Sequence, residues 1–200
     1  MANIIKYEEV TSTNDVAKEL AVKGAVHFTC VASLKQTAGR GRRGKVWKAI
    51  PNNSIAATFV LRQGVDHTLP LVASLAVYDV ISAYVQCQIK WPNDVYCNNK
   101  KNAGILIENL LKGNKVYSTI VGVGLNVNQL KFNSKNKPTS ILNELGVEHD
   151  LKEMLNQLLF FIEKRYLSLR LGKEKTINSD YLALLLGINE VLKFKVGNEV

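Results

Sequence analysis

The sequence has little cysteine and no arrangement of it that suggests a cross-link. It holds 3 cysteines in 200 residues, at Cys30, Cys87 and Cys97. Their wide spacing and odd number fit no disulfide framework. No Cys-x-x-Cys pair or cysteine–histidine cluster offers a metal site. We therefore expect reduced, partly buried thiols and structural or surface histidines.

Signals for a membrane or for secretion are also missing. No stretch approaches the roughly 20 apolar residues that span a bilayer. The first ten residues contain only a short apolar pair, Ile4 and Ile5, followed by charges, and lack the apolar core of a secretory signal. The sequence predicts a cytoplasmic protein without a membrane partner.

What is present suits a globular fold with a basic surface. The chain is 46% hydrophobic, and 200 residues are enough for one domain with a real core. Its net charge is +9, from 26 basic and 17 acidic residues, which favours phosphates, nucleic acid or an acidic protein as partners. Part of the positive charge is concentrated within residues 35–48, at Lys35, Arg40, Arg42, Arg43, Lys45 and Lys48.

Hydrophobic periodicity predicts strands and helices in alternation. We expect a strand end, a cap and a helix over residues 7–24, where Thr11, Ser12 and Thr13 can cap and Gly24 stops the helix. Strand candidates follow at 28–36 and 53–63, and residues 88–98 are expected to form a strand, a turn and a second strand. Two more strand candidates, at 103–111 and 115–128, are joined by a turn at 112–114. Continuous apolar character marks a core helix from about Leu69 to Val85.

The second half of the chain is more helical. Residues 130–138 are polar and basic and are expected to form a loop. Helices are predicted at 140–146, 150–172 and 177–187. The fold class is α/β (α+β), with a mixed, largely antiparallel sheet packed with helices. We expect a domain over 1–186, and residues 187–200 alternate in a β pattern that predicts the start of a second, truncated domain.

The strongest motif is a glycine- and arginine-rich segment at residues 36–47. Glycines permit unusual backbone angles and close approach to a ligand, and arginines supply planar donors for carboxylate or phosphate. A loop of this composition has little reason to stay ordered alone, so closure over a bound anion is one interpretation. A solvated basic loop or a nucleic-acid patch is the alternative. The pattern is neither a Walker A motif nor a Rossmann fingerprint.

Two further motifs carry polar groups on strand ends. Residues 90–94 read Lys-Trp-Pro-Asn-Asp, and Lys101 precedes Asn102, Ala103 and Gly104. Magnesium needs one or two carboxylates beside substrate phosphates, which Asp94 could supply, although an ordinary turn is the simpler interpretation of residues 92–94. Residues 122–128, Gly-Val-Gly-Leu-Asn-Val-Asn, are either a bulged strand end or a wall for a flat ring.

Taken together, these motifs resemble biotin–protein ligases. The family's features are recognisable in order as Ser-Thr-Asn at 12–14, the glycine–arginine loop at 39–47, Lys-Trp-Pro-Asn-Asp at 90–94, Lys-Asn-Ala-Gly at 101–104 and Gly-Val-Gly-Leu-Asn at 122–126. The resemblance is sharp over about residues 7–130 and looser to about 185. It implies the biotin/lipoate ligase catalytic fold, followed by the opening of an SH3-like domain.

The resemblance implies a role for each matching residue. The biotin site would comprise Ser12, Thr13, Asn14, Gln36, Gly39, Arg40, Gly41, Arg42 and Lys101. Nucleotide contacts would come from Arg42, Arg43, Trp47, Lys90, Asn93 and Asn126. Lys101, Arg40 and Lys90 would be catalytic, and Asp94 would bind Mg²⁺.

The implied reaction activates biotin with ATP to give biotinyl-5′-adenylate, then transfers biotin to a lysine of a biotin carboxyl carrier protein. Some family members carry a DNA-binding domain before the catalytic one. Because Ser12 stands so near the first residue, we expect neither that domain nor DNA binding. An exposed edge strand would permit a homodimer. The rival interpretations are a lipoate ligase or octanoyl transferase of the same fold, and a basic nucleic-acid-binding module.

Overall fold

A computed structural model describes residues 3–62, 66–133 and 138–190. Its elements in chain order are β1 (Asn3–Val10), α1 (Thr13–Val22), β2 (Thr29–Gln36), the short 3-10 turn η1 (Arg42–Gly44), β3 (Ser54–Leu61), α2 (Leu69–Ser82), β4 (Cys87–Lys90), β5 (Asp94–Cys97), β6 (Lys100–Lys112), β7 (Lys115–Asn126), α3 (Ile141–Leu145), α4 (Leu151–Arg170) and α5 (Glu174–Ala183). The predicted order of strands and helices is confirmed, with boundaries shifted by a few residues.

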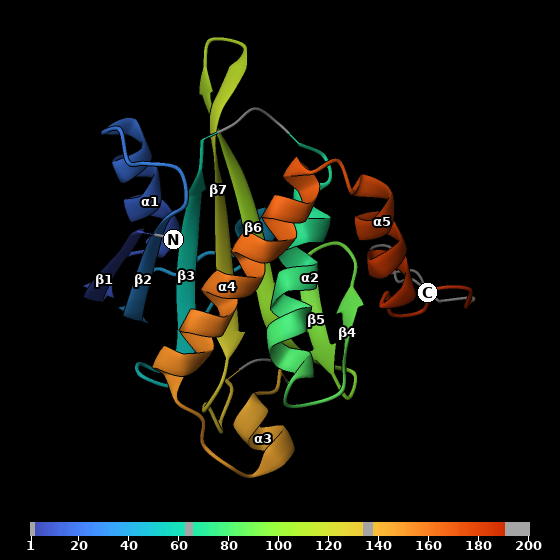
Figure 1. Ribbon diagram of the computed structural model, residues 1–200. Coiled ribbons are helices and arrows are strands. Elements are labelled where there is room, and N and C mark those ends of the chain that lie inside the picture. The colour runs from blue at the N-terminus through green and yellow to red at the C-terminus, as the bar shows by residue number, and fades with distance from the viewer. Residues whose placement is uncertain (1–2, 63–65, 134–137, 191–200) are drawn as a thin grey trace, which may run out of the picture.

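The strands form one mixed sheet of 7 strands in the order β1-β2-β3-β7-β6-β5-β4. β1 and β2 are parallel, and every other neighbouring pair is antiparallel. The expected fold class is therefore confirmed. β6 and β7 form the long hairpin that projects from one end of the molecule, with its turn at the predicted position (Figure 1).

The two faces of the sheet are covered by different helices. Side chains alternate between the faces along a strand, so Phe59 and Val60 of β3 belong to separate apolar clusters. Phe59 belongs to the main core, where α2 and α4 cross the face seen in Figure 1. Val60 belongs to a smaller cluster with Ala17 and Ala21 of α1, on the opposite face.

Helix boundaries follow local sequence signals. Ser12 occupies the N-cap of α1, as expected, but its side chain makes no capping hydrogen bond. Gly24, with φ of +96°, follows the end of α1 and provides the left-handed residue that stops it. Asp150 caps α4 through its carboxylate, which accepts from the backbone N–H groups of Lys152 and Glu153. α2 ends at Ser82, three residues before the predicted Val85.

Two predictions fall partly or wholly outside the described residues. The loop at 130–138 has no helix or strand over 130–133 and at 138, and the rest of it is not described. The β pattern at the end of the chain lies almost entirely within 191–200, also outside the described residues. None of the helices in the described ranges is long and apolar enough to cross a membrane.

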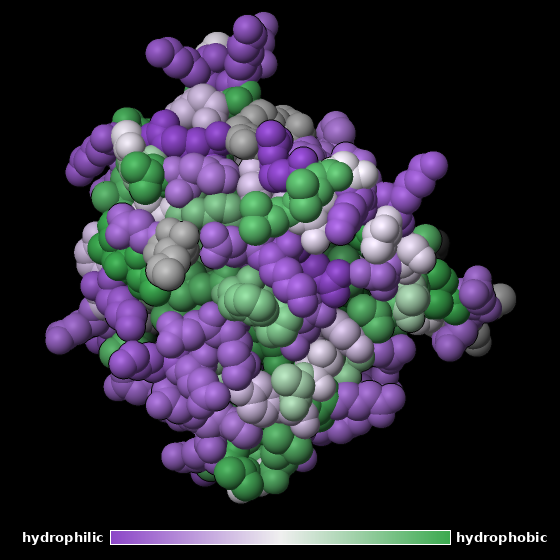
Figure 2. Space-filling model, viewed as in Figure 1, coloured by the Kyte–Doolittle hydropathy of each residue, from purple (hydrophilic) through white to green (hydrophobic). Residues whose placement is uncertain are grey.

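The face with α2 and α4 carries charged and polar side chains over most of its surface, with apolar groups scattered among them (Figure 2). The three cysteines are free and buried. Burial raises the pKa of each thiol to about 12, which leaves it protonated and unreactive at neutral pH. The expected burial of the thiols is confirmed.

Candidate functional site

A cavity of about 110 Å³ lies on the α1 face of the sheet. It collects residues from the start of α1, the end of β2, the glycine–arginine loop, the turn before β5, and the centres of β6 and β7. Those residues are Ser12, Thr13, Asn14, Gln36, Arg40, Gly41, Arg42, Lys45, Val46, Trp47, Asn93, Asp94, Lys101, Gly104, Ile105, Leu106, Gly122, Val123 and Gly124. Motifs far apart in the sequence therefore meet in one place.

A hydrogen-bonded network forms the floor of this cavity. Ser12, Thr13 and Asn14 are all buried. The backbone N–H and the hydroxyl of Thr13 both donate to Gln36 Oε1, over 2.8 and 3.0 Å. The hydroxyl of Thr58, on β3, lies 2.8 Å from both Thr13 Oγ1 and Asn14 Oδ1. These contacts hold several donors and acceptors in fixed directions beneath the cavity.

Glycines on β7 and β6 make room for this network and for Trp47. A Cβ added at Gly122 would collide with the Asn14 amide. One at Gly124 would lie 2.6 Å from Trp47 Cζ2, and one at Gly104 would lie 3.2 Å from Trp47 Cζ3. The proposed wall for a flat ring is thus present, and the ring that lies on it is the chain's own indole.

The glycine–arginine loop has more internal structure than its composition predicted. Gly41 N–H donates to Lys45 O over 2.7 Å, and Trp47 N–H donates to Gly39 O over 2.9 Å. Arg40 forms an ion pair with Asp15 of α1. The loop thus folds back on itself and is tied to α1, contacts that its composition did not indicate.

Lys101 stands at the junction of two cavities. Its Nζ lies 2.6 Å from Asp94 Oδ1 and 5.6 Å from the centre of the Trp47 ring. A second cavity of about 580 Å³ shares Val46, Trp47 and Lys101 with the first and extends to Asn126. Lys101 is therefore the one cationic residue in the described part of the chain that lines both cavities.

Five of the predicted site residues lie away from the first cavity or serve other contacts. Lys90 is exposed, and its Nζ lies 4.5 Å above the ring of Tyr96. Arg43 is exposed with φ of +54°, and it does not line the cavity. Asn126 lines the second cavity and donates to Thr139 O over 3.0 Å.

The remaining two residues, Asn93 and Gly39, make contacts that support the fold. Asn93 lines the first cavity, yet its amide donates to Ile105 O over 2.8 Å and so supports β6. Gly39 does not line the cavity. It lies against the backbone oxygen of Trp47, and an added Cβ would collide with that oxygen.

Few of the described side chains could act as ligands to a metal ion. Among the described residues there is no group of three or more His, Cys, Asp or Glu side chains that could hold one. Asp94 is the one acidic residue in the lining of the first cavity, and it already pairs with Lys101. This donor set suits an ion that brings most of its ligands with it, as magnesium does when bound to phosphates.

The sequence left four residues of this site without a role. Glu108 accepts from Asn14 Nδ2 over 2.8 Å and from Lys18 Nζ over 2.6 Å. Asp15 pairs with Arg40, and Thr58 supports Asn14 from the adjacent strand. Glu108 ends the apolar run of β6, and that interruption was the one visible signal.

Hydrogen bonding and charge act on the Glu108 carboxyl in the same direction. Partial burial alone would raise the pKa of Glu108. Hydrogen bonds from Asn14 and Lys18, with the charges of Lys18 and Arg40, outweigh burial and lower that pKa below its ordinary value. Glu108 is therefore an anion at neutral pH.

Comparison with known proteins identifies the family of this chain. The model of the biotin/lipoate A/B protein ligase family matches residues 7–126. The chain is 36% identical to the bifunctional ligase/repressor BirA of Bacillus subtilis over 174 residues, 82% of this chain and 54% of that protein. It is 38% identical to the biotin–[acetyl-CoA-carboxylase] ligase of Paracoccus denitrificans over 160 residues, 74% of this chain and 66% of that protein.

A solved structure has a similar fold. The biotin protein ligase of Aquifex aeolicus in complex with biotin and ATP superposes with a TM-score of 0.82 at 29% identity, covering 94% of this chain and 80% of that one. The present chain spans only about half the length of the Bacillus relative. With the matched motifs gathered around one cavity, the chain belongs to the biotin/lipoate A/B protein ligase family.

Proposed function

We propose that this chain is an ATP-dependent biotin–protein ligase. In the first step an oxygen of the biotin carboxylate attacks the α-phosphorus of ATP, giving biotinyl-5′-adenylate and releasing pyrophosphate. In the second, the amine of a carrier lysine attacks the carbonyl of that mixed anhydride, and AMP leaves. The names of the relatives, which are biotin ligases, support this proposal.

The position of Lys101 in the lining of both cavities is the observation that carries the proposal. Biotin would occupy the first cavity, with its ring over Ser12, Thr13 and Asn14. The nucleotide would occupy the second, with Asn126 in its lining. Their reacting ends would then meet beside Lys101, where a fixed positive charge reduces repulsion between two anions and stabilises the charge that develops.

Other cavity residues would bind and enclose the reactants. Gln36 would contact biotin from the end of β2, and Arg40 and Arg42 would face its carboxylate and the phosphates. Gly39 and Gly41 would let the loop backbone approach the ligand closely. The closed loop would keep water from the labile anhydride. The chemistry requires no nucleophile from the protein.

The remaining assignments concern the nucleotide and its metal ion. We propose contacts from Trp47, Asn93 and Arg43, and a phosphate contact from Lys90, which would have to leave Tyr96 to make it. Asp94 would hold Mg²⁺ that arrives with ATP. When bound, the ion would neutralise phosphate charge.

The acceptor is proposed to be a biotin carboxyl carrier protein, encountered in the cytoplasm. With a net charge of +9, the chain would attract an acidic carrier by electrostatic steering. Transfer should then slow as ionic strength rises, and a rate indifferent to salt would exclude steering. We also propose that residues 187–200 begin a second domain after the catalytic domain at 1–186.

The test is calorimetric titration with biotin, with and without ATP and magnesium, while pyrophosphate release is followed. Tight biotin binding and one pyrophosphate per chain are expected. Lys101→Gln should lower the rate of adenylate formation by about 100-fold or more, by the removal of one preorganised charge. The matched control is Lys100→Gln, at the exposed neighbouring lysine outside the cavity lining.

Binding of lipoate or octanoate in place of biotin would move the chain to the acyl-transfer members of the family. Nucleic-acid binding without response to any of these ligands would favour the basic binding module instead.

A further inference from the structure

Glu108 connects two parts of the site that are far apart in the sequence. It lies on β6, two residues beyond Leu106 and four beyond Gly104, so all three share the strand face that lines the cavity. One carboxylate oxygen accepts from Lys18 over 2.6 Å. The other accepts from Asn14 over 2.8 Å and lies 3.6 Å from Arg40 Nη2.

The contact with Asn14 determines which way its amide points. Glu108 is an anion and can only accept, so it selects the nitrogen end of the Asn14 amide. The hydroxyl of Thr58 lies 2.8 Å from the oxygen end. Because Gly122 has no side chain, the amide lies against the strand backbone. Asn14 is thereby held in one orientation under the cavity.

The contact with Arg40 acts on the loop. Arg40 stands between two carboxylates, that of Asp15 on α1 and that of Glu108 on β6. The side chains of Arg40 and Glu108 are 42% and 26% exposed, so the pair is partly shielded from water and salt. The first arginine of the glycine–arginine loop is thus tied to the body of the domain from two sides.

We propose that Glu108 is a positioning residue that couples the floor of the biotin site to its lid. It fixes the amide of Asn14 and, through Arg40, holds the loop over the cavity. Glu108 does not itself touch the reacting atoms. This inference rests on the proposed ligase function for its meaning, but the contacts can be tested without any ligand.

The first experiment measures loop opening alone. The loop contains Arg40, Arg42, Arg43 and Lys45, all trypsin sites, and mass spectrometry identifies cleavage there. Glu108→Gln keeps the shape of the side chain and removes its charge. We expect cleavage within residues 40–45 to become about 10-fold faster, the change expected when a hydrogen bond to a charged group is weakened.

The matched control is Asp180→Asn. It also removes one carboxylate from a 2.6 Å ion pair, with Arg165, in the helical layer away from the loop. Its loop should be cleaved at the wild-type rate. If Glu108→Gln fails to fold, Asp15→Asn removes the other carboxylate on Arg40 and should accelerate the same cleavage. Cleavage at the wild-type rate in a folded Glu108→Gln chain, or equal acceleration by Asp180→Asn, would overturn the proposal.

The second experiment measures ligand binding and catalysis. Glu108→Gln should raise the KM for biotin and the release rate of biotinyl-5′-adenylate by about 10-fold each, again the scale of one weakened charged hydrogen bond. In a single turnover at saturating biotin, the rate of pyrophosphate release should change less than about 3-fold, since the positioning residue does not touch the reacting atoms. A fall in that single-turnover rate with unchanged KM would contradict the assignment. A wild-type chain that neither binds biotin nor releases pyrophosphate would refute the ligase function, while the proteolysis result would still stand.

Discussion

The two sides of β7 show how one strand serves two purposes. Val121, Val123 and Leu125 point into the main core and are buried. Gly122 and Gly124, between them, point to the cavity, where the Asn14 amide and the Trp47 ring lie against them. Over residues 121–125 the core side has large side chains that exclude space, and the site side has none. The cavity therefore exists because β7 omits two successive side chains on one face, while the side chains beside them on the other face are packed in the core.

Truncation on the core side should have the largest effect on stability. Leu125→Ala should lower the free energy of unfolding by about 2–5 kcal/mol, because it leaves a cavity in a fully buried position. Urea unfolding measures the change, and calorimetry should show biotin affinity within about 3-fold of wild type, a shift below 1 kcal/mol. A loss of affinity much larger than that would show that the two faces are not independent.

Adding a side chain on the cavity face of β7 should weaken biotin binding as well as lower stability. Gly124→Ala introduces a Cβ 2.6 Å from Trp47 Cζ2, so the indole must move. We expect a loss of about 1–3 kcal/mol from overpacking, together with weakened biotin binding. Because the chain has 2 tryptophans, Trp47 fluorescence is best followed in a Trp91→Phe background.

Trp47→Ala combined with Gly124→Ala provides the internal control. The two changes should be non-additive in stability, since the Cβ added at position 124 has no indole to collide with once Trp47 is truncated. Strict additivity would mean that the glycine does not serve the indole.

A second cluster of an arginine with two carboxylates lies on the core side of the sheet, opposite the cluster around Arg40. Arg165 of α4 donates to both oxygens of Asp79 of α2 over 2.7 and 2.9 Å, and it also pairs with Asp180 of α5. Asp79→Asn should lower the free energy of unfolding by about 1 kcal/mol, because a charge-assisted pair becomes a neutral one. Pyrophosphate release should be unchanged. An effect on catalysis would mean that the helical layer contributes to the site.

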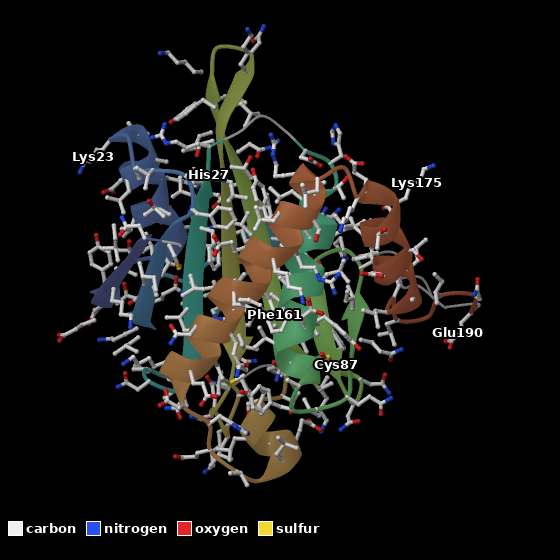
Figure 3. The ribbon with its side chains drawn as sticks, viewed as in Figure 1. Lys23, His27, Cys87, Phe161, Lys175 and Glu190 are labelled. Carbon is white, nitrogen blue, oxygen red and sulfur yellow. The ribbon has the colours of Figure 1, made fainter. Side chains whose placement is uncertain are left out.

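The smallest expected effect concerns pH. His27 (labelled in Figure 3) accepts from the backbone N–H of Arg62 through Nδ1, over 3.0 Å. Burial, helped by the charge of Arg170, lowers the pKa of His27 below its ordinary 6.5. The folded state therefore takes up the proton at lower pH than the unfolded chain does, so stability falls as pH drops below 6.5.

His27→Asn retains an acceptor that does not titrate. It should reduce the dependence of the urea midpoint on pH between about 7.5 and 5.5, by less than about 1 kcal/mol, the scale of one hydrogen bond. His67→Asn, at an exposed position, controls for the loss of a histidine. An unchanged pH dependence in His27→Asn would assign the effect to another group.

The sequence predicted the strands and helices well because their hydrophobic patterns are long and consistent. β3 is apolar except for Ser54 and Thr58 and is buried along its whole length, and the stripe of α4 was visible as Met154, Leu155, Leu158 and Leu159, all buried. Local signals such as Gly24 placed the helix end. Boundaries were less accurate, as at Ser82 of α2, because a helix end depends on what packs beside it.

The site was predicted in its parts and not in its connections. Motifs identified Ser12, Gln36, Arg40 and Lys101, and these do line one cavity. Lys90 belongs to a motif as specific as the others, yet it lies on Tyr96 outside that cavity. A motif records residue types and spacing, whereas the direction of a side chain depends on the strand face to which it belongs.

The family, the order of elements and the glycines that leave room on β7 could be predicted from the residues alone, since these are properties of local pattern. The contacts of Glu108 with Asn14 and Arg40, and of Trp47 with Gly124, follow from the folding of the whole chain. Such contacts join residues separated by up to 94 positions, as between Asn14 and Glu108. No local pattern encodes them, because they depend on which strands pair and on which face of the sheet each helix packs.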